Sequence, residues 1–151
     1  MTDDFGFLRA SEEDLAARAA LADRTVSALR RAGLPAWREG VDEPATSGAV
    51  VRTEPDAELA SAAVSVSWRA SDDVLDAAVE ALAAGRPGAP EVRRPGLDGL
   101  RMRSTLIEVL IRAGLLVTPD NDTMNPDHVL VFGHTDDLPP ALRPTFVRPR
   151  H

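Results

Sequence analysis

The residues of this sequence that are best suited to bind a ligand are Arg93, Arg94, Arg101, Arg103 and His128. A guanidinium group can donate two parallel hydrogen bonds to a carboxylate or phosphate, and the free N–H groups at a helix start also favour anions. Because these arginines surround a helix start that we expect at residue 99, they could bind an acidic peptide or a phosphorylated ligand. The alternative is a solvated surface that neutralises acidic residues elsewhere in the chain.

A second group of chemically active side chains lies near the C-terminus, where His128 follows Asp127 and His134 comes six residues later. Imidazole and carboxylate groups can transfer protons or hold a metal ion. Neighbouring residues of a strand point to opposite faces, so Asp127 would not orient His128 if both belonged to one strand. The spacing also matches no metal-ligand motif. We therefore predict no catalytic residues, no metal site and no cofactor.

The polar run from Asp120 to Asn125 begins like a calcium-binding loop, with oxygen-bearing side chains at its first, third and sixth positions. An EF-hand loop also needs glycine at the sixth position and a bidentate glutamate at the twelfth, where this chain has Asn125 and Val131. We expect a solvated hairpin loop instead.

Several kinds of chemistry are excluded by residue types that the sequence lacks. All 17 basic residues other than histidine are arginine, and Lys, Cys, Tyr and Gln are absent. A Schiff base, a P-loop lysine, a thiolate nucleophile and a disulfide are therefore impossible. Arginine, carboxylates, hydroxyls and three histidines remain available for function.

The net charge of −7 is distributed unevenly along the chain. Residues 1–80 hold sixteen acids and eight arginines, whereas residues 81–118 hold three acids and six arginines. A mostly acidic surface repels phosphate groups, so we expect neither nucleic acid nor a membrane as partner. No apolar run reaches the roughly 18 to 20 residues of a membrane span, and the acidic N-terminus has no signal-peptide pattern. We expect a cytoplasmic protein.

Apolar periodicity, caps and turn residues predict eight elements in the order αβββααββ. The helices are expected at 12–32, from Asp72 to Gly85, and at 99–113; the strands are expected at 34–39, 49–53, 60–68, 115–118 and 128–132. Residues 86–97 are rich in Pro and Gly and should form a connector. Short links between strands favour an α+β domain over residues 1–132, with an antiparallel sheet of about five strands and helices on one face. Residues 133–151 should form a Pro-rich C-terminal tail.

The helix expected at 99–113 is apolar around most of its circumference, which predicts burial on more than one side. Its second side would lie either at the centre of the fold or against a second subunit. The strand expected at 60–68 has one face of small residues that another surface could approach closely. We therefore expect an interface formed by these residues: Met102, Leu106, Val109, Leu110, Ser65 and Ser67.

Together these features favour a non-catalytic protein-binding module, such as an adaptor, a secretion-chaperone-like protein or an inhibitor. Its partner would be another protein, a second copy in a homodimer, or both. The order of elements is similar to that of the small acidic dimeric chaperones of bacterial secretion systems. The alternative is a small anionic-ligand binder or hydrolytic enzyme with a pocket formed by Arg93, Arg94, Arg101 and His128.

Overall fold

The structure, a computed structural model, describes residues 8–59 and 62–137, and within these ranges the elements follow the predicted order. The helices are α1 (Glu12–Arg31), α2 (Asp72–Ala83) and α3 (Pro90–Arg112), followed late in the chain by a short 3-10 helix, η1 (Thr135–Asp137). The strands are β1 (Ala36–Arg38), β2 (Gly48–Thr53), β3 (Val64–Arg69), β4 (Leu115–Pro119) and β5 (Val129–His134). The expected α+β class is confirmed.

The five strands form one sheet in the order β1-β2-β3-β5-β4. The β2/β3, β3/β5 and β4/β5 pairs are antiparallel, as expected, but β1 and β2 run parallel. The connection between β1 and β2 returns the chain to the level at which β1 begins, so that Ala36 lies level with Ala49. The sheet is therefore mixed, with β1 and β4 at its edges.

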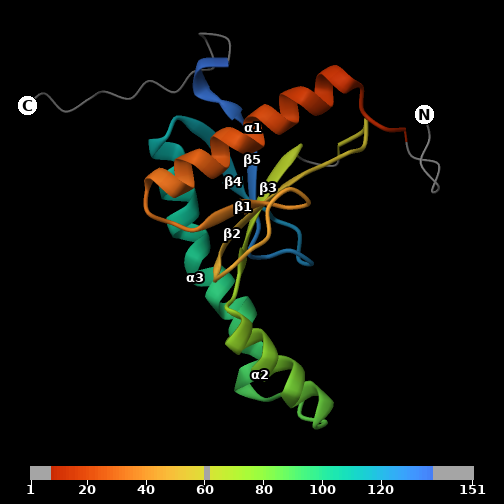
Figure 1. Cartoon of the computed structure of the whole chain (residues 1–151), viewed down its shortest axis with the longest axis vertical. Helices are drawn as coiled ribbons and strands as arrows, with labels where there is room; N and C mark the ends of the chain where they lie inside the picture. The colour runs from red at the N-terminus through yellow and green to blue at the C-terminus, as the bar shows by residue number, and fades with distance from the viewer. Residues whose placement is uncertain (1–7, 60–61, 138–151) are drawn as a thin grey trace, which may run out of the picture.

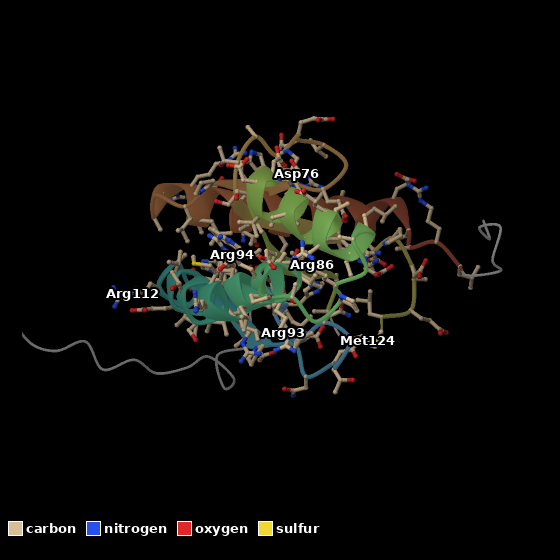
Figure 2. All side chains as sticks on the ribbon, turned by 90° about the horizontal axis from the view of Figure 1, so that it is seen from below. Asp76, Arg86, Arg93, Arg94, Arg112 and Met124 are labelled. Carbon is tan, nitrogen blue, oxygen red and sulfur yellow. The ribbon has the colours of Figure 1, made fainter. Side chains whose placement is uncertain are left out.

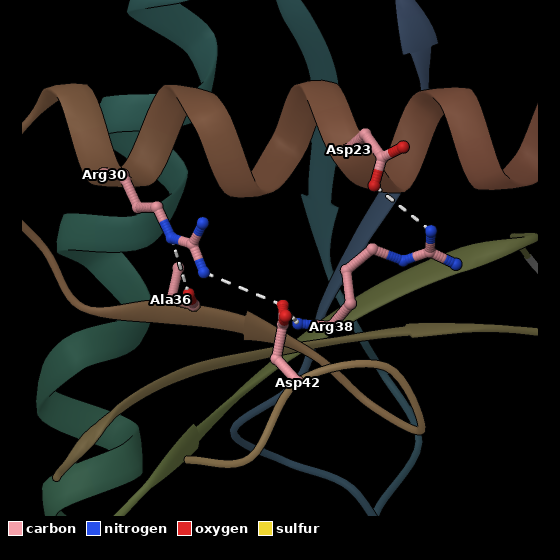
Figure 3. A network of polar contacts seen from close by, with 5 residues as sticks. All are labelled: Asp23, Arg30, Ala36, Arg38 and Asp42. Carbon is pink, nitrogen blue, oxygen red and sulfur yellow. Dashed lines mark hydrogen bonds and ion pairs between the residues drawn. The ribbon is translucent and has the colours of Figure 1, made fainter. Parts of the chain in front are cut away.

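A polar network holds β1 and the connection that follows it against α1 (Figure 3). The Asp42 carboxylate accepts a hydrogen bond from the backbone N–H of Arg38 at 3.0 Å and lies 3.7 Å from the Arg30 guanidinium. Arg30 also donates from Nε to the carbonyl of Ala36 at 2.9 Å. The Arg38 guanidinium reaches Asp23 on α1 at 3.1 Å. Because these contacts fold the connection back on itself, the next strand begins beside the start of β1.

The core lies between one face of the sheet and two helices, α1 and the C-terminal half of α3 (Figure 1). Alternate strand residues point into it, in accordance with the two-residue period of a strand. The principal buried side chains are Val26, Leu29, Val51, Val64, Val66, Leu106, Leu110, Val129 and Val131. The expectation of helices on one face is met by α1 and α3, whereas α2 packs mainly against α3.

The ends of α1 follow the signals in the sequence. The Ser11 hydroxyl accepts a hydrogen bond from the backbone N–H of Asp14 at 3.1 Å, which satisfies one of the free donors of the first turn. Gly33 follows the helix with φ of 88°, a left-handed conformation that glycine adopts without strain. Local chemistry therefore determines both ends of this helix.

The start of α3 differs from the prediction, because the helix begins at Pro90 rather than at residue 99. Proline is well tolerated at the first helical position, where its N–H would have no intrahelical partner. Pro95 lies inside the helix and removes one backbone hydrogen bond, a cost that packing against α2 helps to offset. The connector expected at 86–97 is thus wrong over most of its length. In Figure 1, α2 and the first half of α3 (residues 72–100, the arm) project away from the sheet.

The C-terminal part of the described chain continues past the expected domain end at residue 132. β5 runs through His134 and is followed by η1. Residues 138–151 of the predicted tail lie outside the described residues. Among the helices of the described ranges, none is both long enough and apolar enough to cross a bilayer. The expected cytoplasmic location stays a prediction.

Candidate interaction surface

The four arginines singled out by the sequence all lie on α3 but do not gather at its start. Because the helix begins at Pro90, Arg101 and Arg103 lie about two to three turns from the free N–H groups of its first turn. Arg93, Arg94 and Arg101 are exposed. Arg93 and Arg94 leave the helix in different directions in Figure 2, and Arg93 points away from α2. The helix start therefore does not assemble a set of converging guanidinium groups.

Arg94 forms an ion pair within α3 and also lines a hollow between α2 and α3. Its Nε lies 3.9 Å from the Asp98 carboxylate, one helical turn further on. Asp98 thus lies inside α3 and pairs on its surface. Arg94 also lines a hollow of about 280 Å³ between α2 and α3 together with Glu91 and Asp73. Two carboxylates beside one guanidinium make this hollow a poor site for an anion.

Arg103 has a structural contact that the sequence did not reveal. Its guanidinium donates a hydrogen bond of 2.6 Å to the carbonyl of Pro126, in the loop between β4 and β5. The same loop presses Asp127 against Gly99, where a Cβ atom would lie 2.5 Å from a carboxylate oxygen. Arg103 is thereby held beside the loop that leads to His128. The guanidinium, however, is used to hold the loop, since its partner is a backbone carbonyl.

The two histidines of the described chain do not share a site. His128 precedes β5 and His134 ends it, so a six-residue strand of about 20 Å separates them. In the described parts of the chain, no three His, Asp or Glu side chains are grouped closely enough to hold a metal ion. The carboxylates of the calcium-like loop cap their own backbone: Asp120 accepts from the N–H of Asp122, and Asp122 from that of Met124, both at 2.9 Å.

His134 instead lies in a cleft of about 440 Å³ between α1, the end of α3 and η1. Its Nδ1 lies 3.1 Å from the backbone nitrogen of Asp136 and 3.3 Å from the carboxylate of the same residue. Arg24 and Arg31 also line the cleft, as do Asp136 and Asp137, and Arg24 lies 3.6 Å from Asp137. Because two carboxylates offset two guanidiniums, the cleft does not select for an anion.

Ser65 and Ser67 lie on the face of the sheet opposite the core. Ser67 is level with Val50, and Ser65 is level with Leu130. The segment from Glu39 to Pro44 borders a shallow groove of about 320 Å³ over part of this face, with Trp37, Val50 and Ser67 among its lining residues. Ser65 and Ser67 are both half-buried by the chain itself. Part of the small-residue face is thus covered from within the protein.

The residues of α3 that we expected at an interface are divided between the core and its border. Leu106 and Leu110 have no exposed surface and belong to the chain's own core, so they offer nothing to a partner. Met102 and Val109 are half-buried. A subunit interface through Leu106 and Leu110 is therefore wrong, because the sheet and α1 already cover that side of the helix.

A different side of α3 is left uncovered. Leu97, Leu100 and Ile111 are 48%, 40% and 44% exposed, and together with Ser104 and with Ile107, which is half-buried and packs at the border of the chain's own core, they form what we call the outer stripe. At about 100° per residue these five residues fall within an arc of roughly 80°, centred some 120° from the side of Leu106 and Leu110. Their spacing of three, four, three and four residues was visible in the sequence. The predicted connector ended at Leu97, so the prediction placed Leu97 outside the helix that carries the other four residues.

The C-terminal end of the outer stripe meets a hollow beside the edge strand β4. This β4 hollow has a volume of about 290 Å³ and is lined chiefly by apolar groups: Ile111, Gly114, Leu115, Leu116 and Val117, with Arg112 and Thr135. Leu116, like Ile111, is exposed. Contiguous exposed apolar surface of this kind is typical of interaction sites.

No protein-family model, curated protein or solved structure matches this chain.

Proposed function

We propose that this protein is a non-catalytic protein-binding module, of the adaptor, chaperone or inhibitor kind, that binds its partner through the outer stripe of α3. The single observation that carries the proposal is the exposure of Leu97, Leu100 and Ile111 on one side of a helix whose other side contributes the fully buried Leu106 and Leu110 to the core. Solvent-exposed leucine and isoleucine side chains at three- and four-residue spacing form an apolar surface that can pack against another helix or into a groove of a partner.

The arrangement of polar groups supports binding over catalysis. Arg93, Arg94 and Arg101 are exposed on α3, and Arg103 is engaged with the carbonyl of Pro126. A hydrolytic site needs a nucleophile or activated water held within hydrogen-bond distance of a base and of groups that stabilise negative charge. The pocket of Arg93, Arg94, Arg101 and His128, which is the alternative, would need these side chains to converge, whereas Arg93 and Arg94 leave α3 in different directions (Figure 2) and Arg94 pairs with Asp98.

The charge of the chain supports a protein partner. A net charge of −7 opposes association with nucleic acid or an anionic bilayer, because phosphate groups would be repelled over most of the surface. An apolar stripe flanked by charged residues suits a protein surface, where apolar burial stabilises the complex and the charges select the partner.

Affinity capture with a stripe variant tests this proposal. The full chain, the double variant Leu97→Asp/Leu100→Asp and the control Met124→Asp are each immobilised and exposed to lysate of the native host. Met124 is a suitable control because it is 83% exposed in the β4–β5 loop, away from the stripe. We expect the wild type and Met124→Asp to retain the same protein, which can be the chain itself, and the stripe variant to retain at least about tenfold less.

Two results would overturn the proposal. One is equal retention by the stripe variant, after circular dichroism has shown that it folds. The other is turnover or retention of a small anion that is lost in Arg93→Ala/Arg94→Ala and unaffected in the stripe variant, which would favour the ligand-binding alternative.

A further inference from the structure

We infer that the partner of the outer stripe is a second copy of this chain, with the two α3 helices packed antiparallel about a two-fold axis beside Ser104. The inference deepens the proposed function and rests on it, since it requires the outer stripe to be a binding surface. It adds a specific partner, a relative orientation and a pair of charges that determines that orientation.

The first argument is the spacing of the stripe. Leu97, Leu100, Ser104, Ile107 and Ile111 follow the alternating three- and four-residue intervals of the helix face that packs in a coiled coil. The stripe spans about 21 Å of helix, or four turns. The only hydroxyl residue, Ser104, stands at its centre. A small side chain at the point where two helices cross lets the larger apolar residues on either side come into contact.

The second argument is the match of residues across such an axis. In an antiparallel pair centred on Ser104, each residue before Ser104 in one copy lies opposite a residue after Ser104 in the other copy. The two residues are about the same number of positions from Ser104. Leu97 then faces Ile111 of the other copy, and Leu100 faces Ile107. Each exposed leucine meets an isoleucine, so no charged side chain is trapped between the helices.

The third argument is charge complementarity. Arg101 and Glu108 are both exposed and lie on the same flank of the stripe, about 20° apart around the helix. A two-fold axis perpendicular to the helices brings like flanks together, so Arg101 of each copy faces Glu108 of the other. Glu108 also pairs within its own helix with Arg112 at 2.8 Å, and a carboxylate has enough acceptor sites for two guanidiniums. The pair occurs twice in the dimer.

The fourth argument comes from the arm and the β4 hollow. In the arm, the N-terminal half of α3 extends beyond the sheet (Figure 1), where α2 packs against one side of it and Leu97 and Leu100 stay exposed on another. The proposed axis lays the arm of one copy over the C-terminal end of α3 in the other. Leu97 of one copy thereby reaches Ile111 of its partner, at the edge of the hollow that Leu116 also lines. Both ends of the stripe would be buried by the same contact.

The mass of the protein in solution over a range of concentrations tests the inference first. We expect the wild type to be dimeric, and Arg101→Glu and Glu108→Arg each to weaken the dimer about tenfold, because each creates two like-charge contacts. The double variant Arg101→Glu/Glu108→Arg should recover most of the wild-type affinity, since it reverses both partners. Arg86→Glu, at the tip of the arm beyond the end of the partner helix, is the matched charge control and should change nothing.

Disulfide cross-linking tests the orientation, because the chain contains no cysteine of its own. Ser104→Cys places two thiols beside the axis, and we expect it to form a covalent dimer on mild oxidation. Leu97→Cys places its thiols roughly 21 Å apart in the antiparallel pair and should not cross-link. Efficient cross-linking of both variants would indicate a parallel pair and overturn the inferred orientation.

The outcomes separate this inference from the proposed function. If the wild type is monomeric and Ser104→Cys does not cross-link, the second copy is excluded as partner. Stripe-dependent capture of another protein would then still support a binding module. A dimer that is insensitive to Arg101→Glu and Glu108→Arg overturns the inferred contact, whereas loss of stripe dependence in the capture experiment overturns both proposals.

Discussion

Two sides of the same helix show how similar residues reach different environments. On one side of α3, Leu106 and Leu110 are completely buried by the sheet and α1. On another side, Leu97, Leu100 and Ile111 are left 40–48% exposed. The amino-acid types are nearly the same, so composition does not distinguish the two. Apolar periodicity indicates that a side of a helix will be covered, but the covering surface is determined by the rest of the fold or by a partner.

The arm accounts for the exposure of Leu97 and Leu100. The C-terminal half of α3 lies over the sheet and contributes to the core, whereas the N-terminal half continues past it beside α2 (Figure 1). A helix that extends beyond its own sheet must leave apolar side chains exposed unless another element covers them. The comparison of the two sides can be tested by changing each in turn.

The largest expected effect comes from the buried side. Leu106→Ala or Leu110→Ala should lower the free energy of unfolding by about 2–5 kcal/mol, because each leaves a cavity in the core. Leu100→Ala should lower it by less than about 1 kcal/mol in dilute solution, since its side chain is already 40% exposed. Urea denaturation of the three variants measures the difference. Equal losses on both sides would mean that the outer stripe is buried within a single chain.

A smaller effect is expected on the side of α3 that faces the β4–β5 loop. Arg103→Ala removes the hydrogen bond to the Pro126 carbonyl and should cost about 1 kcal/mol, since the donor is charged but the bond is exposed to water. Backbone amides of residues 120–128 should exchange faster with solvent. Arg94→Ala, which breaks only the exposed pair with Asp98, should cost no more than about 0.5 kcal/mol. Unchanged exchange in the loop would show that Arg103 does not hold it.

The smallest expected effect compares two glycines of α3. Gly96→Ala should stabilise the protein by about 0.5–1 kcal/mol, because alanine favours the helix and no atom lies within 4 Å of the new Cβ. Gly99→Ala should lose that gain or destabilise the chain, since its Cβ would crowd Asp127. Thermal unfolding measures both.

An Asp127→Ala background provides the control for this comparison. With the carboxylate removed, the two glycine substitutions should become more alike. A stabilising Gly99→Ala in the natural background would show that the loop does not pack closely against this side of α3.

Features decided within a few residues were predictable. The cap of α1 by Ser11 and its end at Gly33 depend on neighbouring backbone groups, and the observed helix Glu12–Arg31 agrees closely with the predicted range 12–32. The order of elements followed from apolar periodicity in the same way. The start of α3 differs from the prediction because the prolines and glycines of residues 86–97 favour a connector and Pro95 disfavours a helix interior, a cost that packing of α2 along this segment helps to offset.

The candidate sites depended more heavily on distant contacts. His128 and His134 are close in sequence, yet His128 precedes β5 and His134 ends it, so the extended strand separates them. Arg103 finds its partner 23 residues further on, in a loop whose path no local pattern specifies. The exposure of the outer stripe became visible only once the sheet and α1 had covered the opposite side of α3.

The sequence by itself determined the α+β class, the eight elements, the acidic surface and the absence of thiolate and lysine chemistry, because these depend on residue types and on short-range periodicity. The tertiary structure alone decided the parallel pairing of β1 and β2, the arm, and the division of α3 into a buried side and an outer stripe. These features depend on which surfaces meet across long stretches of chain. A leucine on one side of a helix is as strongly driven out of water as a leucine on the other side. Only its surroundings determine what it packs against.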